Sequence, residues 1–380
     1  ASLLGASLLG ASLLAACGSR DSGAAPVPAF GGGPFAEGTA AADVSTVLVV
    51  ALDGVRPGDI ERPVGELPAL PHFDSLRGSS IRAPEVFCAL TGGNGAMATL
   101  LTGLHGREHG VISVRDLGRT RLDPSVPTLL SAFSDAGWKT TVSLPEGRLG
   151  RGVGGFARGA DTFAAPRPGE PARTADSVLN AVEPQLAEAL TVKGDRVFCL
   201  VCFSDLLQKT SGDLDPTEAK LAAPLIEARM APFASKRAEV ASALDRLRRQ
   251  PAKAIEDFDR LFARSRGSAP AKAWHSARND IELVRIDRAL GRINALLESS
   301  GRASSTAVVV SGLRGRAERE AEARDGPRFQ DKVIRVPLWL RLPGSQAPPL
   351  APADTAAIAP FFADRFGLEL RASAFESNIP

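Results

Sequence analysis

Asp53 is the residue whose type and position most clearly suggest chemistry, because it directly follows a strongly apolar segment. The five residues Val47 to Ala51 are all apolar, too uniform for a half-exposed strand and too few to cross a membrane. They predict a buried strand of a parallel sheet, which ends in Asp53 and Gly54. Open α/β sheets bind ligands beyond this end of their strands. Asp53 is therefore a candidate metal ligand or site acid; the alternative is a carboxylate that only caps the following turn or helix.

A second candidate site is the glycine-rich stretch TGGNG at residues 91–95, which runs into a predicted helix from Ala96 to Thr102. We expect Asn94 to be the N-cap of this helix. The backbone N–H groups of Gly92, Gly93 and Asn94 would then be free to bind a small anion. Helix starts of this kind are common, so the feature alone does not define a function.

Side chains that ligate transition metals are scarce in this chain. It contains 4 His, which leaves few residues for a multi-histidine metal centre. Cys199 and Cys202 form a CxxC motif, but it lies inside the apolar run 197–203. Residues three apart on a strand point to opposite faces, so we interpret these two side chains as buried thiols rather than a zinc or redox pair.

The overall charge indicates no nucleic-acid partner. The 380 residues include 45 Lys plus Arg and 43 Asp plus Glu, a formal net charge of +2. The segment from about 215 to 300 is rich in helix-forming residues whose basic and acidic side chains balance, which is typical of solvated helix faces.

Apolar runs alternate with helical patterns along the chain, which predicts an α/β fold with a mainly parallel central sheet flanked by helices. Further strands are predicted at 81–88, 139–144, 196–203, 306–311 and 336–342, and helices at 70–78, 129–137, 175–190 and 353–366. Residues 145–170 are predicted to be a loop, and the helical segment after 215 is predicted to break at Pro251 and near 267–270.

The N-terminal residues predict export. Residues 1–16 are an uncharged repeat of ASLLG pentads that ends in Leu14-Ala15-Ala16-Cys17, which resembles a bacterial lipobox. We expect segment 1–17 to be a lipoprotein signal with lipidation at Cys17, which would make the membrane a partner. Residues 18–43 are rich in Gly, Ala and Pro and predict a flexible tether. Gly18 and Ser19 favour the outer membrane, on its periplasmic side or at the surface. The α/β domain is assigned to 44–345, with a helical insertion at about 210–275, and residues 346–380 to a C-terminal segment with one helix.

Several segments, in their order along the chain, resemble the sulfatase family of the alkaline phosphatase superfamily. They are VLVVALDGVRPGDI, LPALPHFDSLRGSS, LLTGLHGREHGVIS, DAGWKTTVSL, NDIELVRIDRALGRINALLESSG with TAVVV, and FQDKVIRVPLWLRLPG, which together cover roughly residues 44–345. The resemblance implies the α/β sulfatase fold. It also implies Asp53 as a metal ligand and a nucleophile at the start of the helix that precedes LLTG.

The nucleophile implied by the resemblance is missing at its expected position. Counting ten residues back from Gly103 gives Gly93, and the Pro and Arg of the sulfatase motif correspond to Gly95 and Met97. Thr91 is the remaining weak candidate for a catalytic hydroxyl. His109 lies at the exit of the same helix, where a structural role is the main expectation.

The metal ligands implied by the resemblance are also replaced. The family carries Ser-Asp-His-Gly after its second metal strand, whereas this chain has Leu313 and Arg314 at the ligand positions. A guanidinium has no lone pair for a cation, so Asp53 remains as the one residual ligand position. We expect Arg314 to pair with Asp53, and Arg314 with Gly92, Gly93 and Asn94 to form a metal-free site for a small anion.

These observations favour an exported, lipid-anchored sulfatase-like protein of the bacterial cell envelope that has lost hydrolytic activity and has a binding or structural role. The alternative is an active metal-dependent sulfate- or phosphate-ester hydrolase with a displaced Thr91 nucleophile, and this alternative alone requires a divalent cofactor, Ca²⁺ or Zn²⁺. Whether the chain is an enzyme stays open at this point.

Overall fold

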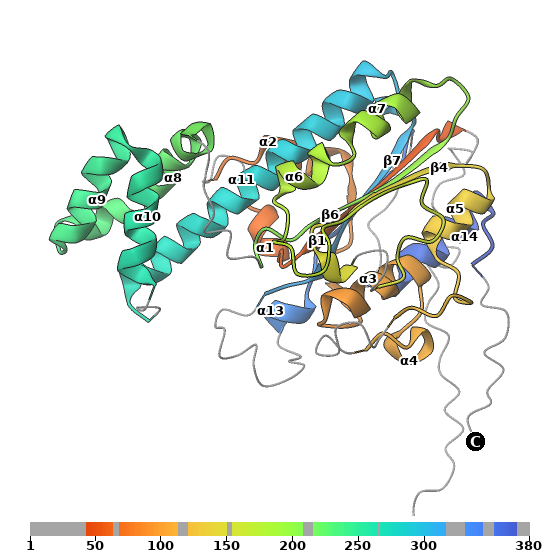
Figure 1. Ribbon diagram of the computed structural model, residues 1–380, viewed down its shortest axis with the longest axis horizontal. Coiled ribbons are helices and arrows are strands. Elements are labelled where there is room, and N and C mark those ends of the chain that lie inside the picture. The colour runs from red at the N-terminus through yellow and green to blue at the C-terminus, as the bar shows by residue number, and fades with distance from the viewer. Residues whose placement is uncertain are drawn as a thin grey trace, which may run out of the picture.

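The apolar run around Val49 forms β1 (Thr46–Asp53), the central strand of a sheet of seven strands among the described residues (Figure 1). The computed structural model describes residues 43–63, 68–112, 121–149, 154–207, 216–263, 267–316, 331–344 and 353–370. The predicted signal segment with Cys17, and the predicted tether up to residue 42, lie outside the described residues.

The remaining strands and helices follow in chain order. The strands are β2 (Ile81–Arg82), β3 (Val86–Phe87), β4 (Lys139–Ser143), β5 (Thr162–Ala164), β6 (Val197–Phe203), β7 (Thr306–Arg314), β8 (Leu338–Arg341) and β9 (Ala353–Asp354). The helices are α1 (Pro57–Ile60), α2 (Pro71–Ser79), α3 (Gly93–Thr102), α4 (Gly106–His109), α5 (Leu129–Asp135), α6 (Ala175–Asn180), α7 (Glu183–Thr191), α8 (Pro216–Ala234), α9 (Ala238–Arg249), α10 (Pro251–Phe262), α11 (Ala269–Ser299), α13 (Asp331–Ile334) and α14 (Ile358–Phe366).

The sheet has the order β2-β8-β7-β1-β6-β4-β5 and is mostly parallel. Strand β1 pairs in parallel with both β6 and β7, while β8 runs antiparallel to β7. Every residue of β1 and of β6 is buried, as expected for strands covered by helices on both faces. This arrangement confirms the predicted α/β class with a mainly parallel central sheet.

Two hydrophobic cores cover the two faces of the sheet. Alternate residues of β1 enter different cores: Val49 packs with residues of α3, α5 and α14, and Val50 packs with residues of α2, α6, α7 and α11. Cys202 belongs to the first core and Cys199 to the second, and neither forms a disulfide. The prediction that these two thiols are buried on opposite faces is confirmed.

A group of helices extends from one side of the sheet domain (Figure 1). Helices α8, α9 and α10 share a third hydrophobic core with the first half of α11, centred on Phe258 and Trp274, whose rings stack at a centroid distance of 4.9 Å. We call α8, α9 and α10 the helical extension. Helix α11 links the helical extension to the sheet domain, because its second half packs on the sheet through residues such as Ile286 and Leu290.

Several predicted element boundaries are wrong. The predicted strand 81–88 is two short strands, β2 and β3, in different sheets, because Pro84 between them has no N–H to donate to a ladder. The predicted helix 175–190 is divided into α6 and α7, with Pro184 in the first turn of α7. The region predicted as loop contains β5, and the predicted C-terminal helix begins only at Ile358, after β9 and a 3₁₀ turn.

Among the described residues, none of the helices combines the length and the apolar character that a transmembrane span requires.

Candidate functional site

Asp53 and Arg314 lie beside each other at the carboxyl ends of two paired strands. They are direct partners in the register of β1 and β7, just after a bulge at Leu52/Asp53, and the N–H of Gly54 donates to the carbonyl of Arg314 at 2.9 Å. The guanidinium Nε of Arg314 donates to Oδ1 of Asp53 at 2.8 Å. Only 2% of the Asp53 side chain and 20% of the Arg314 side chain are exposed. The ion pair expected from the sequence is therefore present and largely buried.

Arg314 also reaches the start of α3. Its Nη1 donates to the backbone carbonyl of Thr91 at 3.0 Å. The adjacent Asp53 carboxylate, opposed by burial and aided by Glu146 and the nearby Cys88, raises the pKa of Arg314, so the guanidinium stays charged. One arginine thus connects the ends of β1 and β7 to the loop before α3.

The predicted anion-binding turn differs in detail from the expectation. Gly92, not Asn94, is the N-cap of α3, and Asn94 lies buried within the first turn. Gly95 is required by packing, because a Cβ atom there would come within 2.7 Å of the carbonyl of Val111. The hydrogen bond of Arg314 goes to Thr91, directly before the N-cap, so the structure places Arg314 beside the predicted anion-binding residues.

A second ion pair lies next to the first and was not found from the sequence. Arg316 contacts Asp59 with both Nη atoms, and its Nη1 also donates to the carbonyl of Gly54 at 2.9 Å. Arg56 in turn donates through Nε to the carbonyl of Arg316 at 3.2 Å. The signal in the sequence is the Arg-Gly-Arg at 314–316, which repeats a cation two residues after the first one.

The residues around Asp53 do not form a site for a divalent cation that prefers oxygen ligands. Oδ1 of Asp53 already accepts from a guanidinium, and Leu313 is fully buried in the hydrophobic core beside Val336. A cation would have to displace Arg314 from Asp53 and would find no lone pair on its nitrogens. In the described part of the chain, no three His, Cys, Asp or Glu side chains form a group that could hold a metal ion.

Cys88 is the other potential nucleophile in this region. Burial raises the pKa of its thiol to about 12, and its Sγ lies 3.6 Å from the carbonyl of Val333. At neutral pH the thiol keeps its proton, and the thiolate is the reactive form. Cys88 is therefore a buried structural thiol.

His109 has the contacts of a structural side chain. Its Nδ1 accepts from the N–H of Val111 at 3.0 Å, which leaves the proton on Nε2, 3.0 Å from the hydroxyl oxygen of Thr99. The side chain is 2% exposed, and burial lowers its pKa from 6.5 to about 4. One ring nitrogen thus holds the turn that follows α4, and the other bonds α4 to α3.

This lowered pKa predicts a loss of stability in mild acid. The folded protein keeps His109 neutral while the unfolded chain binds a proton below about pH 6.5. The contribution of neutral His109 to the free energy of unfolding is therefore complete above that pH. This contribution falls by about 3 kcal/mol as the pH drops toward 4. Urea unfolding at pH 7 and pH 4.5 should show the difference, and a His109→Gln variant should lack that part of it. An unchanged pH dependence in the variant would contradict this role.

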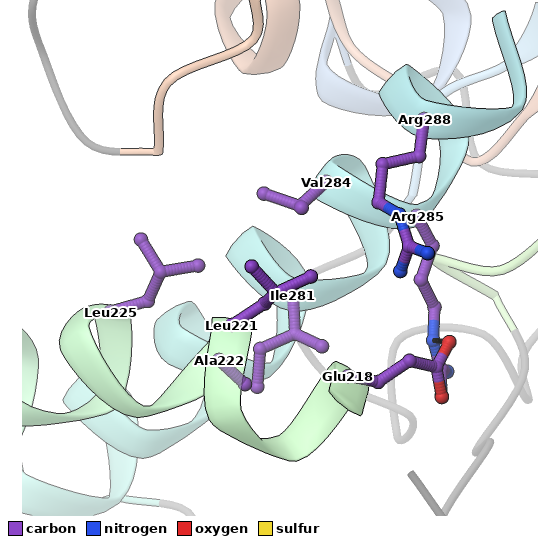
Figure 2. A pocket seen from close by; sticks show the side chains of 8 residues that line it. All are labelled: Glu218, Leu221, Ala222, Leu225, Ile281, Val284, Arg285 and Arg288. Carbon is purple, nitrogen blue, oxygen red and sulfur yellow. Dashed lines mark hydrogen bonds and ion pairs between the residues drawn. The ribbon is translucent and has the colours of Figure 1, made fainter. Parts of the chain in front are cut away.

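A groove that includes neither Asp53 nor Arg314 in its lining lies between α8 and α11 (Figure 2). Its lining residues are Glu218, Leu221, Ala222, Leu225, Ile281, Val284, Arg285 and Arg288. It has a volume of about 240 Å³, including space open to solvent, which is below the usual size of a small-molecule site. Glu218 and Arg285 form an ion pair at its edge, with Nη2 of Arg285 2.9 Å from Oε2 of Glu218.

Comparison with known proteins supports the fold assignment. The model of the type I phosphodiesterase / nucleotide pyrophosphatase family matches residues 47–129, which include Asp53, the rest of β1 except Thr46, and α3. No curated protein sequence matches the chain.

Solved structures match over most of the chain at low sequence identity. The phosphonate monoester hydrolase of Agrobacterium radiobacter is 17% identical, with a TM-score of 0.57 over 86% of this chain and 74% of that one. A putative sulfatase from Bacteroides thetaiotaomicron is 14% identical, with a TM-score of 0.58 over 87% and 72%. The C-terminal periplasmic domain of EptC from Escherichia coli, in complex with zinc, is 13% identical, with a TM-score of 0.54 over 86% and 83%. At these identities the likeness shows the fold.

Proposed function

We propose that this chain, which has the fold of sulfatases and related hydrolases of the alkaline phosphatase superfamily, is a non-catalytic protein with a binding or structural role at the bacterial cell envelope. The hydrogen bond from Arg314 to Asp53 carries the proposal. In this fold the carboxylate at the end of β1 is the expected cation ligand, and here it holds a guanidinium of the same chain. The positive charge of the site is then supplied by Arg314.

The proposal extends to a small anion as ligand. Arg314 lies between Asp53 and Thr91, beside the N-terminus of α3, where backbone N–H groups favour negative charge. Sulfate and phosphate are the simplest probes of this chemistry. Because the Asp53 carboxylate already neutralises part of the guanidinium charge, we expect weak binding, in the millimolar range.

The proposed location is outside the cytoplasm, attached to the membrane by a lipid on Cys17. A periplasmic domain is among the proteins with this fold, which supports an extracytoplasmic location. The small uncharged residues before Cys17 support the lipid anchor, and Gly18 and Ser19 support the outer membrane.

Two measurements on the full chain test the loss of activity. Elemental analysis of the purified protein is expected to find less than 0.1 metal ion per chain, and nitrophenyl sulfate and nitrophenyl phosphate are expected to stay unhydrolysed with Ca²⁺ or Zn²⁺ added. A Thr91→Ala variant should behave identically. Stoichiometric metal together with hydrolysis that disappears in Thr91→Ala would overturn the proposal in favour of an active hydrolase.

A further inference from the structure

The groove between α8 and α11 has an apolar part that is open to solvent. Leu221 of α8 is 50% exposed, although leucine is usually buried, and Val284 of α11 is half-buried. Leu225 and Ile281 also line the groove, and they are 7% and 3% exposed. Helices α8 and α11 thus form an apolar surface along which a hydrocarbon chain can lie.

The charged side chains of the same groove lie together at one end (Figure 2). Glu218 accepts from Nε and Nη2 of Arg285 at 3.0 and 2.9 Å, and Nη1 of Arg285 donates to Glu282 at 2.9 Å. Arg288 is half-buried about one turn further along α11, and within the described residues it makes no ion pair or hydrogen bond. The apolar part of the groove therefore ends beside a guanidinium that no described acidic residue neutralises.

The size of the groove selects a narrow ligand. Its volume of about 240 Å³, including space open to solvent, corresponds to about eight groups of the size of a water molecule at about 30 Å³ each. A methylene group is of similar size, so one unbranched chain of about eight carbons fills this space, whereas a drug-sized molecule does not fit.

We propose that this groove binds a medium-chain fatty acid, with the carboxylate on Arg288 and the hydrocarbon chain along Leu221 and Ile281. The chain removes the apolar surface of Leu221 from water, and the carboxylate gives the guanidinium of Arg288 a bidentate partner. Glu218 leaves the head group room for a negative charge, because both of its oxygens accept from Arg285.

The two halves of the ligand set the expected affinities. Octanoate is expected to bind in the millimolar range, as usual for a ligand of about ten non-hydrogen atoms. Each methylene buried in the groove strengthens binding about fourfold, so the affinity should rise from hexanoate to octanoate and level off in longer acids. Acetate, which lacks the chain, and octanol, which lacks the charge, should each bind at least about tenfold more weakly than octanoate.

Titration of the full chain at pH 7, followed by NMR of its backbone amides, tests the proposal. Octanoate is expected to shift the amide signals of residues 218–225 and 281–288 and to leave those of β1 and β7 unchanged. Arg288→Gln should weaken octanoate to the affinity of octanol, and Leu221→Asn should weaken both ligands. Arg335→Gln, at an arginine that is 39% exposed on another surface, is the matched control and should bind octanoate like the wild type.

Equal affinity for octanoate and octanol would overturn the proposal, and so would octanoate binding that persists in Arg288→Gln. An affinity that keeps rising fourfold per carbon beyond octanoate would indicate non-specific partition and would equally contradict it. Sedimentation of the chain without fatty acid examines a different occupant of the groove. A dimer that is lost in Leu221→Asn would assign the groove to a second copy of this chain.

Discussion

Replacing Arg314 with leucine is expected to lower the free energy of unfolding by about 4 kcal/mol at pH 7. The variant leaves the Asp53 carboxylate, 2% exposed, without its cation and takes a donor from the carbonyl of Thr91. Removing one partner of a buried ion pair is costly because the other charge stays desolvated. Urea unfolding followed by circular dichroism measures the loss.

Two further variants separate this ion pair from a general effect of removing an arginine. Arg335→Leu removes an exposed pair, with 39% of Arg335 and 52% of Glu85 exposed, and should cost less than about 1 kcal/mol. Adding Asp53→Asn to Arg314→Leu removes the buried charge and should recover much of the lost stability. Equal losses in Arg314→Leu and Arg335→Leu would show that the Asp53–Arg314 pair does not replace a cation in this fold.

The central sheet was predictable from the sequence because its strands are continuous apolar runs. Strands β1, β6 and β7 are buried on both faces, so no polar alternation obscures their extent, and the predicted spans lie within or close to the observed ones. The short outer strands were not predictable. Strands β2, β3 and β9 have only two residues each, and their pairing depends on which distant segment lies beside them.

The candidate site was predictable only in part, for a similar reason. The pairing of Asp53 with Arg314 follows from the order of motifs along the chain, because both follow buried strands that are neighbours in this fold. The predicted N-cap of α3 was wrong by two positions. Gly92 adopts the extended backbone that an N-cap needs, and no side chain cap is required. The ion pair between Asp59 and Arg316 and the burial of the Asp205 carboxyl depend on packing between distant segments, which local sequence patterns do not contain.

Replacing Arg285 with leucine is the second change expected to have a large effect. The Arg285 side chain is 4% exposed, and it neutralises Glu218, 13% exposed, and Glu282, 6% exposed. Its loss should lower the free energy of unfolding by about 4 kcal/mol at pH 8. The deficit should decrease toward pH 5, because the buried Asp205, whose negative charge Arg285 favours and whose pKa burial and Glu282 raise to about 7, then holds a proton.

Arg288→Leu is the matched control for this variant. Arg288 lies three residues further along α11, on the same groove, and makes no ion pair or hydrogen bond within the part of the chain that the structure describes (Figure 2). Its replacement should change stability by less than about 0.5 kcal/mol. If the two variants were equally stable, or if the Arg285→Leu deficit were the same at pH 5 and pH 8, the buried carboxylates would not depend on Arg285. The junction between α8 and α11 would then be held by its apolar contacts alone, since Leu225 and Ile281 lie in the same interface.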